Sequence, residues 1–378
     1  MIELTLNMVE DLAIGTAILG SGGGGEPYVF KLAAKRSIQE NGPVQVLDLL
    51  EIPDDYLIFT SAAIGSGIVL SEKLIHGGEA TLAVKELEKI LGKKCDALVS
   101  IEIGGVNGVT PLIPAAQLHL PLVDGDMMGR AFPELQMSVP SLYNINPSPI
   151  IILDSIGNQT IIRTADTRLA ENLARSVTMQ LGGFCMLALF PMTGNQIKNA
   201  VIPGSISRAL KIGQKVQEAR LHGGEIHRRL VDATSGIFLF RGKVKEIHRQ
   251  ITGGGSRGEI LLEGVGEQAL QTMTVHFQNE FILATLNRKI VASVPDTIVL
   301  MDTHTTIPVT VESARSGLDV VVIGLPSAPC WQTPAGLALV GPRIFGYESD
   351  YHPLLEQKQG STINMLGKSG MGRRGSKI

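Results

Sequence analysis

The 378-residue sequence has few charged residues and little excess of either sign. Charged residues make up 18% of the chain, and 33 basic residues are set against 36 acidic ones, for a net charge of −3. Nucleic-acid-binding proteins usually carry a strongly basic surface, so this balance gives such a partner no electrostatic support. Hydrophobic residues make up 44%, which indicates a globular chain rather than a disordered one.

Long apolar runs are also missing. Runs such as residues 184–190 and 320–325 are far shorter than the roughly 18 residues that a membrane-spanning helix needs. The first twelve residues carry three acidic side chains and no basic one, unlike a signal peptide. The three cysteines (Cys95, Cys185 and Cys330) are far apart and predict neither a disulfide framework nor a close metal-binding pair. We therefore expect a cytoplasmic protein with no membrane partner.

Helix and strand patterns alternate through the first third of the chain. Apolar spacing predicts helices over 7–19, 28–40 and 79–91, and strands over 44–50, 56–61, 96–103 and 121–123. Strands that alternate with helices are typical of βαβ units around a parallel or mixed sheet. The overall fold class is therefore α/β, or α+β when the whole chain is considered.

The pattern changes from Ile237 onward, where glycines separate short β-rich runs. Short β-rich runs separated by glycines predict an antiparallel barrel or sandwich. We divide the chain into an N-terminal α/β domain (1–165), a C-terminal helical and β-rich domain (166–356) and a mobile basic tail (357–378), since the tail is rich in Gly, Ser, Lys and Arg.

Glycine is the residue in excess, at 43 of 378 residues, and one cluster is unusual. Ser21, Gly22, Gly23, Gly24 and Gly25 lie between two predicted helices. Successive glycine N–H groups and a helix N-terminus can bind a phosphate, a carboxylate or a deprotonated ring, which makes this run a candidate substrate-binding loop. A flexible turn between helices is the alternative. The run is not a Walker A motif, because no Gly-Lys-Ser/Thr follows it.

Glu102 and Asn107 lie at the C-terminal end of the strand predicted over 96–103, where ligands bind in open α/β sheets. We consider Glu102 a candidate catalytic base or ligand, and Asn107 a candidate hydrogen-bond donor to the substrate. The alternative role for Glu102 is to cap the next helix.

A second acidic motif follows the next strand. Asp124 and Asp126, two residues apart, resemble a general acid/base pair or a site for a divalent metal ion. Arg130 can keep a neighbouring carboxylate ionised or bind an anionic part of the substrate. A salt-bridged turn is the alternative interpretation.

Three residues of the C-terminal half are further candidates. His304, among hydroxyl side chains after a predicted strand, is a candidate general acid/base. Trp331, the only tryptophan, can stack on a flat ring. Cys330 can act as a nucleophile only with a depressed pKa, and we favour a packing role for it.

Six motifs together resemble one bacterial family. It was long of unknown function, was often labelled hydantoinase-like, and was later named for S-methyl-thiohydantoin desulfurase. The motifs are AILGSGGGG (17–25), EIGGVN (102–107), DGDMMGRAFP (124–133), FQNE (277–280), VPD (294–296) and VGPR (340–343). The resemblance covers about residues 8–353. It implies an α/β N-terminal domain, a β-rich C-terminal domain, and hydrolysis of a five-membered thiohydantoin or hydantoin ring.

Such hydrolysis needs an activated water, an acid for the leaving group and donors for oxyanion charge. Glu102, Asp124 and Asp126 can supply the base, either directly or through a metal-bound water held by Asp124 and Asp126. Arg130, Asn107 and the glycine run can hold the ring, and His304 or Trp331 can close over it.

Two other functions remain open from the sequence. The scarcity of histidine (eight residues) and the lack of a strong metal motif favour a non-catalytic binding module or a partner subunit of a hydantoin-degrading system. The glycine run instead suits an ATP-dependent hydantoinase or oxoprolinase relative. In each case we expect a small-molecule ligand and a homo-oligomer, as is common for cytoplasmic enzymes of this size.

Overall fold

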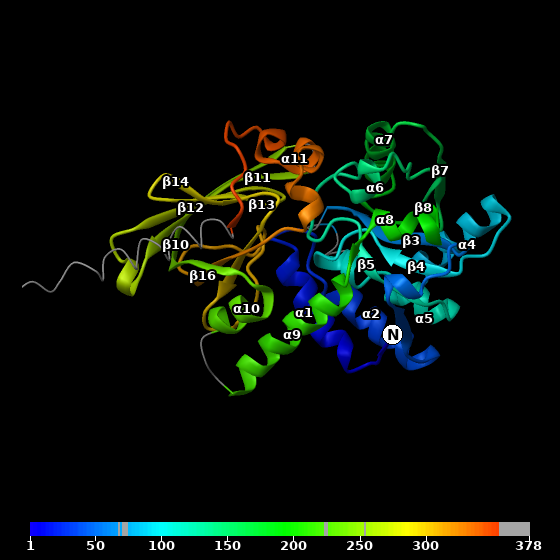
Figure 1. Ribbon diagram of the computed structural model, residues 1–378, viewed down its shortest axis with the longest axis horizontal. Coiled ribbons are helices and arrows are strands. Elements are labelled where there is room, and N and C mark those ends of the chain that lie inside the picture. The colour runs from blue at the N-terminus through cyan, green and yellow to red at the C-terminus, as the bar shows by residue number, and fades with distance from the viewer. Residues whose placement is uncertain (67–68, 70–74, 223–225, 253–254, 355–378) are drawn as a thin grey trace, which may run out of the picture.

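The computed structural model describes residues 1–66, 69, 75–222, 226–252 and 255–354 (Figure 1). Two sheets dominate it: one surrounded by most of the helices, and one formed by the β-rich last third of the chain. Every helix in these ranges is too short or too polar to cross a lipid bilayer. The predicted basic tail (357–378) lies outside the described residues.

The first sheet is mixed, as the alternation of elements predicts. Nine described strands form it in the order β1-β2-β5-β4-β3-β8-β6-β7, with β9 paired to β5. The four central strands β2, β5, β4 and β3 run parallel, and the flanking strands are antiparallel. The strands are β1 (Ile2–Leu4), β2 (Val44–Leu47), β3 (Leu57–Gly65), β4 (Ala97–Ser100), β5 (Leu122–Asp126), β6 (Ile150–Leu153), β7 (Gln159–Ile162), β8 (Phe184–Thr193) and β9 (Ile202–Pro203).

Helices cover both faces of this sheet because its strands are apolar on both sides. Successive side chains alternate between faces, so Ile58 packs into one core and Phe59 into the other. The Phe59 core includes side chains of α1 (Met8–Leu19), α2 (Tyr28–Asn41), α4 (Glu79–Leu91), α5 (Leu112–Leu118), α9 (Ser205–His222) and α10 (Ile226–Thr234). The Ile58 core includes side chains of α6 (Val139–Leu142), α7 (Thr167–Gln180), α8 (Gly194–Ala200) and α11 (Pro334–Val340).

The second sheet is antiparallel and curls into a half-barrel, which confirms the β-rich expectation. Its described strands have the order β14-β13-β12-β11-β10-β16-β15. Register shifts in β10 against both of its neighbours bend the long strand. A third core, which includes Phe240, Phe277 and Phe281, fills the curl. The strands are β10 (Ile237–Thr252), β11 (Gly255–Gly264), β12 (Thr272–Gln278), β13 (Glu280–Leu286), β14 (Lys289–Ser293), β15 (Thr297–Asp302) and β16 (Asp319–Leu325).

The chain remains with the first sheet well beyond its middle. Strands β8 and β9 complete that sheet, and the second sheet starts only at Ile237. A domain division at residue 165 stays a prediction. The positions that matter for the site are the chain segments where the two sheets meet.

Candidate active site

The glycine run joins the first sheet's helices to the second sheet. Ser21 adopts a left-handed backbone (φ 52°), and its Oγ both donates to the Ile298 carbonyl at 2.9 Å and accepts from the Ile298 N–H at 3.1 Å. Gly22 has φ 81°, and a Cβ there would lie 2.4 Å from the ring of Phe281. The glycine run predicts a close approach of the backbone to a neighbouring group, and the structure shows one. Ser21 and Gly22, however, approach residues of the second sheet and do not line the cavity.

Gly23, Gly24 and Gly25 line a cavity of about 230 Å³ where the two sheets meet. This volume is below the roughly 300–1,000 Å³ of sites for drug-sized ligands, so the cavity suits a smaller molecule. A Cβ on Gly23 would lie 2.5 Å from Oε1 of Glu280. The Glu280 side chain therefore occupies the space beside Gly23, which weakens the phosphate-binding interpretation of the run.

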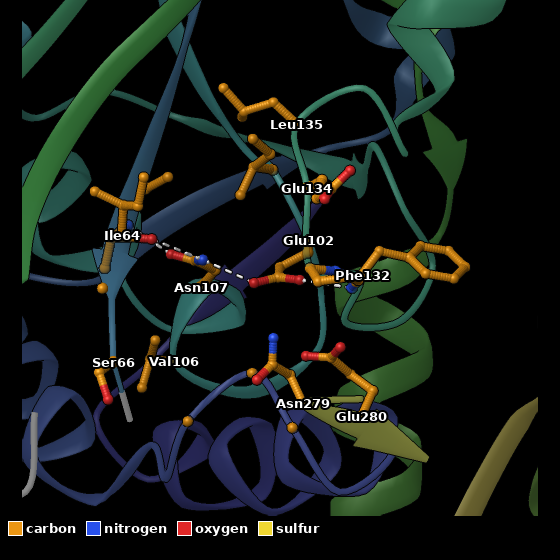
Figure 2. A pocket seen from close by; sticks show the side chains of 18 of the residues that line it. Ile64, Ser66, Glu102, Val106, Asn107, Phe132, Glu134, Leu135, Asn279 and Glu280 are labelled. Atoms are coloured by element: carbon orange, nitrogen blue, oxygen red, sulfur yellow. Dashed lines mark hydrogen bonds between the residues drawn. The ribbon is translucent and has the colours of Figure 1, made fainter. Parts of the chain in front are cut away.

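Both halves of the chain contribute walls to the cavity. The apolar lining includes Ile64, Ile101, Val106, Phe132, Leu135, Phe184 and Leu187. The polar lining includes Ser66, Glu102, Asn107, Glu134, Glu171, Arg175, Ser256, Asn279, Glu280 and Glu312. Figure 2 shows Glu102, Asn107, Asn279 and Glu280 converging on one region of this space.

Glu102 lies on the cavity wall, as its position after β4 predicts. Its Oε1 accepts from Nδ2 of Asn107 at 2.8 Å, and its Oε2 accepts from the Phe132 N–H at 3.2 Å. The Ala63 N–H donates to Oδ1 of Asn107 at 2.7 Å, which fixes the amide orientation so that Nδ2 faces the carboxylate. The Asn107 amide thus donates to Glu102 and orients its carboxyl group, in addition to lining the cavity. Burial raises the pKa of Glu102 to about 8.

A second acid, Glu280, lines the same cavity from the first position of β13. Glu280 is 4% exposed, and its Oε2 has no hydrogen-bond partner among the residues that the structure describes. Burial raises the pKa of Glu280 to about 8, although the positive charge of Arg130 opposes the shift. The preceding residue, Asn279, has a left-handed backbone (φ 62°) and accepts from the Ser256 N–H at 2.8 Å.

The sequence reasoning missed Glu280 and Asn279 as site residues. The available signal was an acidic residue at the start of an otherwise apolar strand, EFILATL. A carboxyl group in such a strand is buried, and strongly perturbed buried acids concentrate at functional sites.

Arg130 lies behind the cavity and is not part of its lining. Its guanidinium is buried and donates to the carbonyls of Ala131 (3.1 Å), Asp296 (2.6 Å) and Phe281 (3.0 Å). Burial lowers its pKa to about 10, and the nearby charge of Glu280 opposes that shift most. Arg130 thus joins the two sheets and favours the ionised form of Glu280, which is one of the two roles that the sequence suggested; it does not line the cavity, where an anionic substrate group would bind.

Asp124 and Asp126 face the N-terminus of α9 and do not line the cavity. Oδ1 of Asp124 accepts from the N–H groups of Ile206 (2.9 Å) and Ser207 (3.1 Å). Oδ2 of Asp126 accepts from the N–H groups of Ile103 (2.9 Å), Met128 (3.0 Å) and Gly129 (2.6 Å). Ser205 and Ser207 donate their hydroxyls to Asp126 and Asp124, respectively. Both aspartates therefore organise backbone.

The two aspartates also do not form a metal site. Their oxygens accept from N–H and O–H groups, which compete with a cation for the same lone pairs. Within the described ranges, no group of three or more His, Cys, Asp or Glu side chains is arranged to hold a metal ion. A metal-bound water at Asp124 and Asp126 therefore does not fit the residues present.

The C-terminal candidates lie apart from the cavity lining. The side chain of His304 is 75% exposed, and its Nε2 lies 3.0 Å from Asp319. Trp331 is buried; its indole N–H donates to the Met128 carbonyl at 2.8 Å, and its ring packs edge-on against Phe132. Trp331 therefore supports a cavity wall instead of stacking on a ligand. Burial raises the pKa of Cys330, which disfavours the reactive thiolate.

The comparisons with known proteins agree with the resemblance inferred from the motifs. No curated protein matches the chain. A crystal structure of a protein from Chromobacterium violaceum is 24% identical and has a TM-score of 0.78; the match covers 94% of this chain and 100% of that one, which shows a shared fold. The family model described as "S-Me-THD-like, N-terminal domain" matches residues 7–164, and "S-Me-THD-like, C-terminal domain" matches residues 164–354. The chain therefore belongs to the S-Me-THD-like family and carries both of its domains.

Proposed function

We propose that this protein hydrolyses a small five-membered cyclic amide or thioamide, such as an S-methyl-thiohydantoin, with Glu102 and Glu280 as the reacting acids. The observation that carries the proposal is that two buried carboxyl groups, one from each half of the chain, face the same small cavity and have pKa values raised to about 8. Water activation and leaving-group protonation need one ionised and one neutral acid near working pH.

The hydrogen bonds assign the two roles. Both oxygens of Glu102 accept from fixed N–H donors, which favours its ionised form over a protonated one. Oε2 of Glu280 is buried without a hydrogen-bond partner among the described residues, so no fixed donor favours its ionised form, and Glu280 is the acid that keeps its proton. We therefore assign Glu102 as the general base and Glu280 as the general acid.

The chemistry balances for an S-methyl-thiohydantoin. Water attacks the ring carbon that carries the sulfur: Glu102 accepts one proton of the water as the carbon–oxygen bond forms, and the electron pair of the carbon–nitrogen double bond moves to the ring nitrogen, which takes the second proton of the water. The carbon–sulfur bond then breaks, and Glu280 gives its proton to the departing methanethiolate. The products are methanethiol and the hydantoin ring, and proton transfer from Glu102 to Glu280 through solvent restores the starting state.

This assignment predicts a bell-shaped pH dependence. The active form of the pair carries one proton, so kcat/KM should be highest near pH 8. Activity should fall at lower pH as Glu102 becomes protonated, and at higher pH as Glu280 loses its proton. A rate that is flat from pH 6 to 10 would contradict the assignment.

Hydrolysis of a panel of hydantoins, 2-thiohydantoins and S-methyl-thiohydantoins tests the proposal. Ring absorbance and released sulfide or thiol are followed for the wild type, for Glu102→Gln and Glu280→Gln, and for Glu267→Gln, whose carboxylate lies on the exposed surface. We expect turnover by the wild type and the control, and a loss of about 10²-fold or more in each cavity variant.

Two results would count against the proposal. If the folded wild type hydrolyses none of the compounds in the panel, the binding-module or partner-subunit function is favoured. Full activity in both cavity variants would place the chemistry elsewhere. We also expect turnover to survive a chelator, because the proposed residues act without a metal; loss of activity that added metal restores would contradict that part.

A further inference from the structure

The proposed reaction also needs a hydrogen-bond donor for the negative charge that develops on the ring. As water adds to the carbon that carries the sulfur, electrons move to the ring nitrogen. Where this nitrogen adjoins the ring carbonyl, conjugation passes part of the charge to the carbonyl oxygen. A fixed N–H group beside that oxygen stabilises the charge. Among the described residues of the cavity lining, Asn107 and Asn279 carry side-chain amides.

The two amides differ in what their N–H groups contact. Nδ2 of Asn107 donates to Oε1 of Glu102 at 2.8 Å and to the Ala63 carbonyl at 3.2 Å, so both of its hydrogens are used. Nδ2 of Asn279 makes no hydrogen bond to any residue that the structure describes, although the rest of this side chain is held in place. Asn279 is therefore the amide that keeps its donor for a ligand.

The orientation of the Asn279 amide is fixed by the turn between β12 and β13. Its backbone N–H donates to the Ser256 carbonyl at 2.7 Å, and its Oδ1 accepts from the Ser256 N–H at 2.8 Å. Because a backbone N–H can only donate, the amide atom that faces Ser256 is the oxygen, and Nδ2 points away from it. Figure 2 shows the Asn279 amide directed toward Glu102, in the region where Glu280 also lies.

A second asparagine shows which part of this arrangement the turn itself requires. Asn287, between β13 and β14, also has a left-handed backbone (φ 48°). Its N–H donates to the Thr272 carbonyl at 2.9 Å, and its Oδ1 accepts from the Thr272 N–H at 3.0 Å. Asn287 is exposed and outside the cavity lining. The shared turn thus explains the backbone and Oδ1 of Asn279, but it makes no use of Nδ2.

We propose that Asn279 is a further catalytic residue, whose Nδ2 donates a hydrogen bond to the carbonyl oxygen of the substrate ring and stabilises the charge that this oxygen gains in the transition state. The identity of the reaction rests on the proposed function, whereas the contact with a ring carbonyl can be tested without it. The same turn places this donor next to Glu280, the proposed acid, in the chain.

Two substitutions separate the donor from the turn. Asn279→Asp keeps an oxygen for the Ser256 N–H and suits the left-handed backbone, but it loses the donor; Asn279→Gly loses the side chain without adding charge. We expect each to lower kcat about 10²-fold, and to raise KM by less than about tenfold. The matched controls Asn287→Asp and Asn287→Gly should keep the wild-type kcat and KM, and thermal unfolding shows whether each variant is folded.

Calorimetric binding of two small rings tests the contact without turnover. Hydantoin carries the ring carbonyl in question, and imidazolidin-2-one has a CH₂ group in its place. We expect the wild type to bind hydantoin about three- to tenfold more tightly, as one hydrogen bond provides. Both Asn279 variants should bind the two rings about equally, whereas both Asn287 variants should keep the wild-type preference.

Each outcome decides the inference. Loss of kcat in Asn279→Gly alone would assign the effect to Oδ1, loss in Asn279→Asp alone would assign it to added charge, and either would overturn the proposal. Equal losses in the Asn287 controls, no binding of hydantoin by the wild type, or a hydantoin preference that survives both Asn279 substitutions would also overturn it. Absence of turnover together with a preference that depends on Asn279 rejects the proposed activity and leaves the contact standing.

Discussion

Replacing Glu280 by glutamine should change how the stability of the protein depends on pH. The carboxyl pKa is about 8 in the folded chain, raised by burial, against an ordinary value of 4.5. Between these values the folded state keeps its proton and the unfolded state releases it. Rising pH therefore favours unfolding, and the free energy of unfolding falls across this window. Glutamine, a neutral residue of the same shape, removes this contribution.

The structure sets the size of the effect. At about 1.4 kcal/mol for each pH unit, the interval from 4.5 to about 8 corresponds to at most about 5 kcal/mol. Electrostatic coupling to Glu102 and water that enters the cavity reduce this free-energy difference. We therefore expect Glu280→Gln to be about 2–5 kcal/mol more stable than the wild type at pH 9. At pH 5 the two should be nearly equal, because the native side chain is then also neutral.

Urea unfolding at several pH values from 5 to 9 measures this difference. The exposed variant Glu267→Gln serves as the control and should follow the wild-type curve throughout. Parallel curves for Glu280→Gln and the wild type would refute the argument, because they would mean that Glu280 ionises at an ordinary pKa in the folded protein.

Three further predictions follow from the contacts. Asp126→Ala leaves three buried N–H groups without an acceptor and should cost about 3 kcal/mol or more in urea unfolding, whereas Asp124→Ala, at the N-terminus of α9, should cost about 1 kcal/mol. Gly22→Ala meets both a left-handed backbone and the Phe281 ring, so we expect a loss of about 2 kcal/mol or more, visible as a lower Tm. His304→Ala should leave kcat/KM unchanged, because this exposed side chain lies outside the cavity lining.

Local patterns were sufficient to predict the fold class. Helical spacing over 79–91 and the β-rich runs after Ile237 correspond to α4 and the second sheet. These patterns reflect burial on one or both faces of an element, which the order of side chains encodes directly. The assignment of β8 and β9 to the first sheet depends on pairing between distant segments, and no local pattern indicates it.

The site was harder to predict, for a reason that Asp124 and Asp126 illustrate. Residues two apart on a strand point to the same side, and both carboxylates accept hydrogen bonds from residues at the start of α9. What occupies that side is decided by tertiary packing: the N-terminus of α9 lies there, and Ser205 and Ser207 donate to the two carboxylates. Glu102 differs from the two aspartates because a cavity, and not a helix N-terminus, lies next to its side chain. It therefore remains a candidate catalytic residue.

The position of the two acids between the sheets explains how their pKa values come to be near neutrality. Glu102 follows a strand of the first sheet and Glu280 begins a strand of the second, while Arg130 donates to carbonyls on both sides of the junction. Burial opposes ionisation of each acid, and the positive charge of Arg130 favours ionisation of Glu280. Because Arg130 contacts backbone of both halves, a shift between the sheets alters burial and charge together. The cavity and its chemistry therefore depend on the packing of the two halves, and neither half alone contains the pair.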